Sequence, residues 1–262
     1  AANPAGEVLY LPAWIRGSYM IRDFARNLIT IEASCNGQSL AIEKLDKHSW
    51  RVAPCSDTLT LTYTVYAWDL SVRAAHLDTT HAYFNGPSLF LAVQGREHEM
   101  CECHIAVPAG KAQFHWQVAT AMPAHVIDGK GFGSYRLPDY ESLLDYPVEI
   151  GELDEHCFRV RGKLHRFVAT GRHRADFARI CNDLSKICAE HVDLFGELPV
   201  QEYLFLLWVE NQGYGGLEHG NSSSLMCSLE DLPTLVVRDM SEGYRRLLGL
   251  CSHEYFHLWN VK

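Results

Sequence analysis

The pentapeptide His253-Glu254-Tyr255-Phe256-His257 fits an H-E-x-x-H pattern near the end of this 262-residue chain. The pattern requires an α-helix, because there side chains four residues apart lie one turn above each other on one face. Two imidazole nitrogens placed in this way can bind one zinc ion, and the intervening glutamate can reach a water on that ion. The pattern therefore predicts a Zn²⁺ peptidase site, with His253 and His257 as metal ligands and Glu254 as the catalytic base.

The flanking residues favour this helix. Apolar residues recur at steps of three and four, which predicts a helix over residues 241–262: Leu247, Leu248, Cys251, Tyr255, Leu258 and Trp259. From Leu247 onward the segment is apolar nearly all round, so we expect it in a core, where an unsatisfied His-Glu-His set is costly. The alternative is a chance match in a chain with 14 histidines, with both histidines as ordinary core residues. Gly249 is either a tolerated glycine or a point of close approach for a substrate or another backbone.

Charge and composition exclude some classes of binding partner and indicate a cellular location. A net charge of −9 argues against nucleic acid or an anionic membrane surface, and no apolar run reaches transmembrane length. The nine cysteines are scattered and odd in number, so we expect reduced core thiols and a cytoplasmic location. The chain starts without methionine, so a removed signal peptide and a periplasmic location remain open. The oligomeric state is not readable from the sequence.

The periodicity changes along the chain. Residues 58–67 alternate polar and apolar side chains, residues 88–93, 102–107 and 113–119 look similar, and Asn36-Gly37 predicts a turn. Residues 177–192 instead follow a helical period that ends at Gly196, and residues 202–209 predict a buried strand. We therefore expect an α+β protein: an N-terminal all-β, sandwich-like domain over residues 1–168 and part of a catalytic domain over residues 169–262.

The segment Gly215-Gly216-Leu217-Glu218-His219 lies between the predicted strand and the predicted catalytic helix. Glycines let a substrate backbone approach closely, and a carboxylate beside them can bind the free amine of a peptide. A turn with a solvated glutamate is the alternative. Upstream of H-E-x-x-H, the segment resembles the glycine-x-glutamate strand of aminopeptidase zincins, and this resemblance implies that Gly215, Gly216 and Glu218 bind a peptide with a free N-terminus.

The sequence resembles the glycyl aminopeptidase family of zinc metallopeptidases, whose members usually carry a C-terminal PDZ domain. The resemblance rests on residues 11–15, 17–26, 65–75, 146–151, 215–219 and 252–262. It implies an N-terminal β domain, a thermolysin-like catalytic domain of the glutamate-zincin (gluzincin) type, and an aminopeptidase that prefers small N-terminal residues such as glycine and alanine.

The resemblance also implies a third zinc ligand, a glutamate about twenty residues past the second histidine. We therefore expect the chain to be truncated at both ends and, taken alone, to bind zinc weakly and hydrolyse little. Two alternatives remain: a zincin endopeptidase in which Glu218 does not bind an amine, and a catalytically incompetent zincin-like module that binds peptides.

Overall fold

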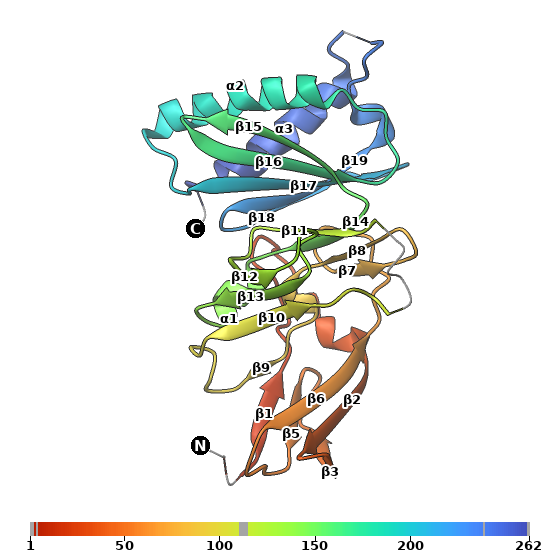
Figure 1. Ribbon diagram of the computed structural model, residues 1–262, viewed down its shortest axis with the longest axis vertical. Helices are drawn as coiled ribbons and strands as arrows, with labels where there is room; N and C mark the ends of the chain where they lie inside the picture. The colour runs from red at the N-terminus through yellow and green to blue at the C-terminus, as the bar shows by residue number, and fades with distance from the viewer. Residues whose placement is uncertain (1–2, 4, 110–114, 238, 261–262) are drawn as a thin grey trace.

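The computed structural model describes residues 3, 5–109, 115–237 and 239–260. Figure 1 shows two parts: several small sheets in the N-terminal part, and a larger sheet with two long helices in the C-terminal part. No helix in the described ranges is both long and apolar enough to cross a membrane. The largely β N-terminal part, with few and short helices, confirms the predicted fold class.

Among the described residues, the N-terminal part contains four antiparallel sheets. The first has the order β4 (Ile42–Lys44), β5 (Ser49–Val52), β1 (Glu7–Tyr10), β9 (Ala92–Val93), and the second β3 (Gln38–Leu40), β2 (Leu28–Cys35), β6 (Leu59–Val65). The third has the order β10 (Cys101–Ile105), β13 (Gly133–Leu137), β12 (Ala124–Ile127), and the fourth β11 (Gln117–Thr120), β14 (Val148–Gly151), β8 (His81–Phe84), β7 (Ala75–Leu77). Short helices η1 (Phe24–Asn27), η2 (Gly86–Ser88) and α1 (Tyr140–Leu144) connect them.

Some of the strands predicted for the N-terminal part are correct, and others are wrong or only partly described. Strands β6 and β10 lie at the predicted alternating segments, and Asn36 and Gly37, with φ of 49° and 77°, form the turn between β2 and β3. The strand predicted over residues 88–93 is wrong except at Ala92–Val93, because the segment begins inside the 3-10 turn η2. The strand predicted over 113–119 starts outside the described residues, and β11 begins at Gln117.

The C-terminal part is a five-stranded sheet of order β15 (Asp154–Val160), β16 (Lys163–Thr170), β17 (Glu202–Glu210), β19 (Ser222–Ser228), β18 (Gly215–Glu218). Strands β16, β17 and β19 are parallel, whereas β15 and β18 are antiparallel edge strands. The helices α2 (Phe177–Phe195) and α3 (Glu242–Phe256) pack on it, and η3 (Leu229–Asp231) precedes α3. Gly196 ends α2 as predicted, with φ of 89°.

Strand β17 is apolar between its two terminal glutamates because both of its faces are covered. Phe205 and Leu207 join the core beneath the two helices, while Leu204 and Leu206 join a cluster with Ala119 that faces the N-terminal part. The C-terminal sheet therefore lies between its helices and the sheet of β11, β14, β8 and β7, as Figure 1 shows.

The strand pairing moves the boundary between the two parts. We predicted a break between residues 168 and 169, but β15 and β16 pair with each other, and β16 pairs along its length with β17. The sheet of the C-terminal part thus begins at Asp154. Alternating strands resemble each other in sequence whichever sheet they join, so β15 and β16 looked like further strands of the N-terminal domain.

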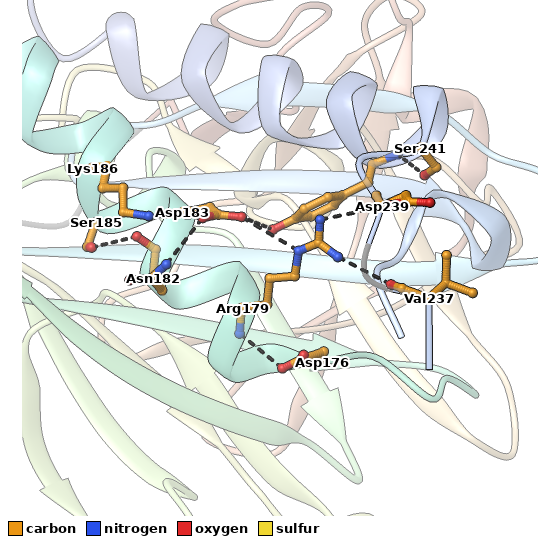
Figure 2. A network of polar contacts seen from close by, with 10 residues as sticks. Asp176, Arg179, Asn182, Asp183, Ser185, Lys186, Val237, Asp239 and Ser241 are labelled. Atoms are coloured by element: carbon orange, nitrogen blue, oxygen red, sulfur yellow. Dashed lines mark hydrogen bonds and ion pairs between the residues drawn. The ribbon is translucent and has the colours of Figure 1, made fainter. Parts of the chain in front are cut away.

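A polar cluster joins α2 to the start of α3, and Figure 2 shows it from close by. The Arg179 guanidinium lies 4.9 Å from the ring centre of Tyr244 and donates to the Val237 and Asp239 carbonyl oxygens at 3.3 and 3.4 Å. The Tyr244 hydroxyl donates to Asp183 Oδ2 at 3.0 Å. These contacts fix the first turn of α3, the helix that carries the H-E-x-x-H pattern, against α2.

One cysteine pair differs from the sequence-based expectation. Cys35 and Cys55 form a disulfide, whereas we expected all nine cysteines to be reduced. The other seven are free, and most of them are buried. The two paired cysteines are 20 residues apart, a spacing with no recognisable motif. The cytoplasmic location stays a prediction.

Candidate active site

Helix α3 presents the H-E-x-x-H residues. It begins after Ser241, whose hydroxyl accepts from the Tyr244 amide at 3.0 Å, a regular N-cap. It ends at Phe256, earlier than predicted, and residues 261 and 262 of the predicted range lie outside the described residues. His257 is the C-cap residue with φ of −63° and ψ of −10°, so its backbone stays helical and keeps its ring one turn beyond that of His253.

The two imidazoles converge. Their Nε2 atoms lie 3.3 Å apart, and His257 Nδ1 lies 3.1 Å from the carbonyl oxygen of Asn260. A carbonyl oxygen only accepts, so Nδ1 carries the proton and the lone pair of His257 is on Nε2. Two nitrogens that each lie 2.0–2.1 Å from a tetrahedral zinc ion are themselves about 3.3 Å apart. The spacing of the two Nε2 atoms therefore fits such an ion. The tautomer of His257, with its proton on Nδ1, leaves Nε2 free to bind the metal.

Glu254 is buried beside this pair, and its Oε2 has no hydrogen-bond partner. One potential ligand atom from each of His253, Glu254 and His257 lies within 4.8 Å of the others. Burial raises the pKa of Glu254 to about 8; the negative charge of Glu218 adds to this, and Arg73 acts against it. A buried carboxyl without a partner is costly, and such groups concentrate where charge or protons are handled.

Strand β18 brings the predicted substrate-binding residues Gly215, Gly216 and Glu218 to the same place. A Cβ atom on Gly216 would lie 2.0 Å from Glu254 Oε1, so only glycine lets the strand pass this close to α3. Glu218, at the end of β18, is 7% exposed. Arg73 of the N-terminal part donates to the Gly216 carbonyl oxygen at 3.4 Å. Because β18 is an edge strand of its sheet, its outer side is open to pairing with an extended peptide.

A loop of the N-terminal part covers Glu218. Gly17 has φ of +79°, and a Cβ atom there would lie 2.6 Å from Glu218 Oε2. Sequence reasoning gave this loop no role in the site. The only available signal was that residues 17–26 belong to the stretches that carry the family resemblance, because a contact across 201 residues of chain leaves no local pattern.

These residues line one cleft of about 940 Å³. All six predicted site residues border it: Gly215, Gly216, Glu218, His253, Glu254 and His257. Residues 17–20 and Arg22 of the N-terminal loop form a further wall. The structure thus brings the two predicted sets together, and the role of each residue stays a prediction.

Gly249 faces this cleft, and a Cβ atom there would meet no atom within 4 Å. Replacing Gly249 with alanine should therefore stabilise α3, with an expected gain in unfolding free energy of up to about 1 kcal/mol. Urea denaturation of wild type and variant measures it. Loss of stability would mean that the glycine is required by a close backbone approach.

A second histidine cluster, His76 with His81, belongs to a hydrogen-bonded network. His81 Nδ1 lies 2.8 Å from Glu149 Oε1, and His81 Nε2 lies 3.0 Å from His76 Nδ1. Asp78, which lies nearby, accepts from the Thr80 and His81 amides. Both nitrogens of His81 are partnered, and burial raises the pKa of Glu149 to about 7. The network stabilises the contact with the C-terminal sheet, where the His81 ring packs 4.1 Å from that of Trp208.

Two histidines and a glutamate in an H-E-x-x-H arrangement on a helix are the feature that defines the zincin class of peptidases. Comparison with known families agrees: the profile of the peptidase M61 N-terminal domain matches residues 2–152. The chain belongs to this family, which is a family of glycyl aminopeptidases. A search of curated proteins finds no match.

Solved structures give the same fold. The crystal structure of an aminopeptidase N family protein from Idiomarina loihiensis matches with a TM-score of 0.96 and 44% identity, over 100% of this chain and 44% of that chain. Legionella pneumophila aminopeptidase A, in complex with aspartic acid, matches with a TM-score of 0.56 and 15% identity, over 96% and 30% of the two chains. An M1 zinc metallopeptidase from Deinococcus radiodurans matches with a TM-score of 0.50 and 12% identity, over 96% and 56%.

The last two similarities show the fold alone. The chain spans less than half the length of the Idiomarina protein.

Proposed function

We propose that the protein with this chain is a zinc-dependent aminopeptidase that removes small N-terminal residues, glycine and alanine, from peptides. The observation that carries the proposal is the convergence of the paired histidines, Glu254 and Glu218 on one cleft. Membership of the M61 family supports the preference for small residues. The negative charge of the whole chain agrees with a peptide rather than a nucleic acid as partner.

His253 and His257 would hold the zinc ion through their Nε2 atoms. When bound, zinc supplies a water of lowered pKa and polarises the scissile carbonyl group. Glu254 takes a proton from the attacking water onto its carboxylate and later delivers it to the leaving amine. Glu254 is buried and lines the same cleft as the two histidines, so its carboxylate lies beside the position of the attacking water.

Glu218 would bind the ammonium group of the substrate. An ion pair at this buried position fixes the first residue of the peptide beside the histidines, which restricts cleavage to the first peptide bond. The outer side of β18 supports the proposal, since the main chain of the substrate can pair with Gly215 and Gly216 there. A downstream glutamate as the third zinc ligand and a C-terminal PDZ domain also belong to the proposal. Both rest on the family resemblance.

The test replaces Glu218 with alanine in the full-length protein and compares one peptide with a free and with an acetylated N-terminus. We expect kcat/KM for the free peptide to fall by about 100-fold, because a buried charge-assisted pair contributes about 3 kcal/mol to binding in the transition state. Zinc content should not change. Glu190→Ala, which removes an exposed carboxylate on α2, is the matched control.

The same experiment separates the alternatives. A wild-type protein that cleaves the acetylated peptide as fast as the free one is an endopeptidase. A full-length protein that binds zinc and peptide but turns over neither is the incompetent peptide-binding module.

A further inference from the structure

A second cavity, of about 540 Å³, lies at the junction of the two parts. It is lined by residues 10–16, by residues of α1 and by His219, which follows β18. The same loop supplies both sites: Arg16 borders this cavity, and the next residue, Gly17, borders the cleft. Its volume falls within the range of small-molecule sites.

His219 borders this cavity and has a ring nitrogen without a hydrogen-bond partner. The residue is 4% exposed, and its Nε2 has no hydrogen-bond partner. Its Nδ1 lies 3.5 Å from Asp145 Oδ1, and Asp145 Oδ2 accepts from the Gly220 amide at 3.0 Å. In the neutral imidazole, the nitrogen that faces the carboxylate carries the proton and Nε2 holds the lone pair. A buried acceptor of this kind is costly unless a ligand donates to it.

The charges around the cavity favour a cation. Three carboxylates line it, those of Glu97, Glu141 and Asp145, and Arg16 is the only guanidinium or ammonium group among its described lining residues. Arg16 pairs with Glu141 and lies 3.9 Å from Asp145. The Glu97 carboxylate accepts from the Tyr10 hydroxyl at 3.2 Å. After these pairings, negative charge and acceptor atoms remain in excess.

The aromatic and aliphatic side chains that line the cavity suit the apolar part of a ligand. The rings of Tyr10 and Tyr140 meet edge to face with centroids 6.3 Å apart, and Leu11, Ile15 and Leu144 add aliphatic surface. Trp14, which is 58% exposed, borders the cavity and can cover an occupant. Aromatic faces also attract an ammonium group.

We propose that this cavity is a second binding site, separate from the cleft, for a small organic amine with an apolar body. The amine donates to His219 Nε2 within the field of the carboxylates, and the body packs against the aromatic rings. Glu218 and His219 are consecutive, as are Arg16 and Gly17, so an occupant contacts the two backbone segments that hold the Glu218 carboxylate. The binding itself does not depend on peptidase activity.

Calorimetric titration of the full-length protein with benzylamine and with neutral benzyl alcohol tests the proposal. We expect benzylamine to bind at least 10-fold more tightly, because only the amine brings a positive charge. His219→Phe, which removes the acceptor, and Ala13→Phe, which fills the cavity without touching a charge, should each weaken binding at least 10-fold. Glu218→Gln, which alters the cleft, should leave this binding in place.

Three outcomes overturn the proposal: equal binding of the amine and the alcohol, benzylamine binding that survives both cavity variants, or binding lost in Glu218→Gln alone. The last would place benzylamine in the cleft. Where the variants fail to fold, ¹⁵N NMR of the wild-type histidines decides. Benzylamine should shift the Nε2 resonance of His219, and an unmoved resonance at saturating amine contradicts the site.

Discussion

Replacing Glu254 with glutamine is expected to lower turnover by about 10²–10⁴-fold while the zinc content stays unchanged. Glutamine has nearly the same shape, so it fits the space against Gly216 that Glu254 fills. It cannot take up a proton at the position of the carboxylate, so the water is no longer activated by a base. Steady-state kinetics on a glycyl or alanyl substrate and metal analysis of the purified full-length protein measure the two quantities.

Glu242→Gln is the matched control, because Glu242 is an exposed glutamate in the first turn of the same helix. It should keep wild-type turnover. Wild-type turnover in Glu254→Gln would show that another group is the base. A loss of zinc along with activity would show that Glu254 supports the metal rather than the proton transfer.

The second large effect is expected from Gly216→Ala. The added methyl group would overlap with the Glu254 side chain, at 2.0 Å from Oε1 and 2.5 Å from Cδ. Overpacking of this kind costs about 1–3 kcal/mol of unfolding free energy. Glu254 can relieve the overlap only by leaving its position, so turnover should fall by about 100-fold or more. Gly215→Ala, in which the nearest atom to the new Cβ is 3.8 Å away, should lose little stability.

A double-mutant cycle isolates the cause. In a Glu254→Ala background the overlap no longer exists, so Gly216→Ala should cost little stability there, and the coupling free energy should account for most of its effect in wild type. Urea denaturation of the four proteins gives the coupling. Equal costs in both backgrounds would show that glycine is required at position 216 for a backbone reason unrelated to Glu254.

The sequence predicts best where a single element carries the signal. The helical period of α2, its stop at Gly196 and the apolar run of β17 were all readable, because each follows from burial of one local segment. The helix of the H-E-x-x-H pattern was also correct, although it ends at Phe256. Leu258 and Trp259 continue the helical spacing of apolar residues past the end of α3, so its length was overestimated.

What the sequence did not reveal depends on contacts between distant segments. The assignment of β15 and β16 to the C-terminal sheet is decided by the parallel pairing of β16 with β17, which alternation does not encode. The Cys35–Cys55 disulfide likewise had no diagnostic spacing. In the candidate site, the residues predicted from motifs do share one cleft, but Arg73 and the loop at Gly17 were missed, since they enter it from another part of the chain.

The packing of Gly17 on the Glu218 carboxylate means that the two parts cannot be exchanged independently. A hybrid that joins the C-terminal part to the β part of a distant relative would keep its histidines but lose the lid on its acidic residue. Such a hybrid should become less selective for unblocked chain ends before it loses the ability to hold a metal.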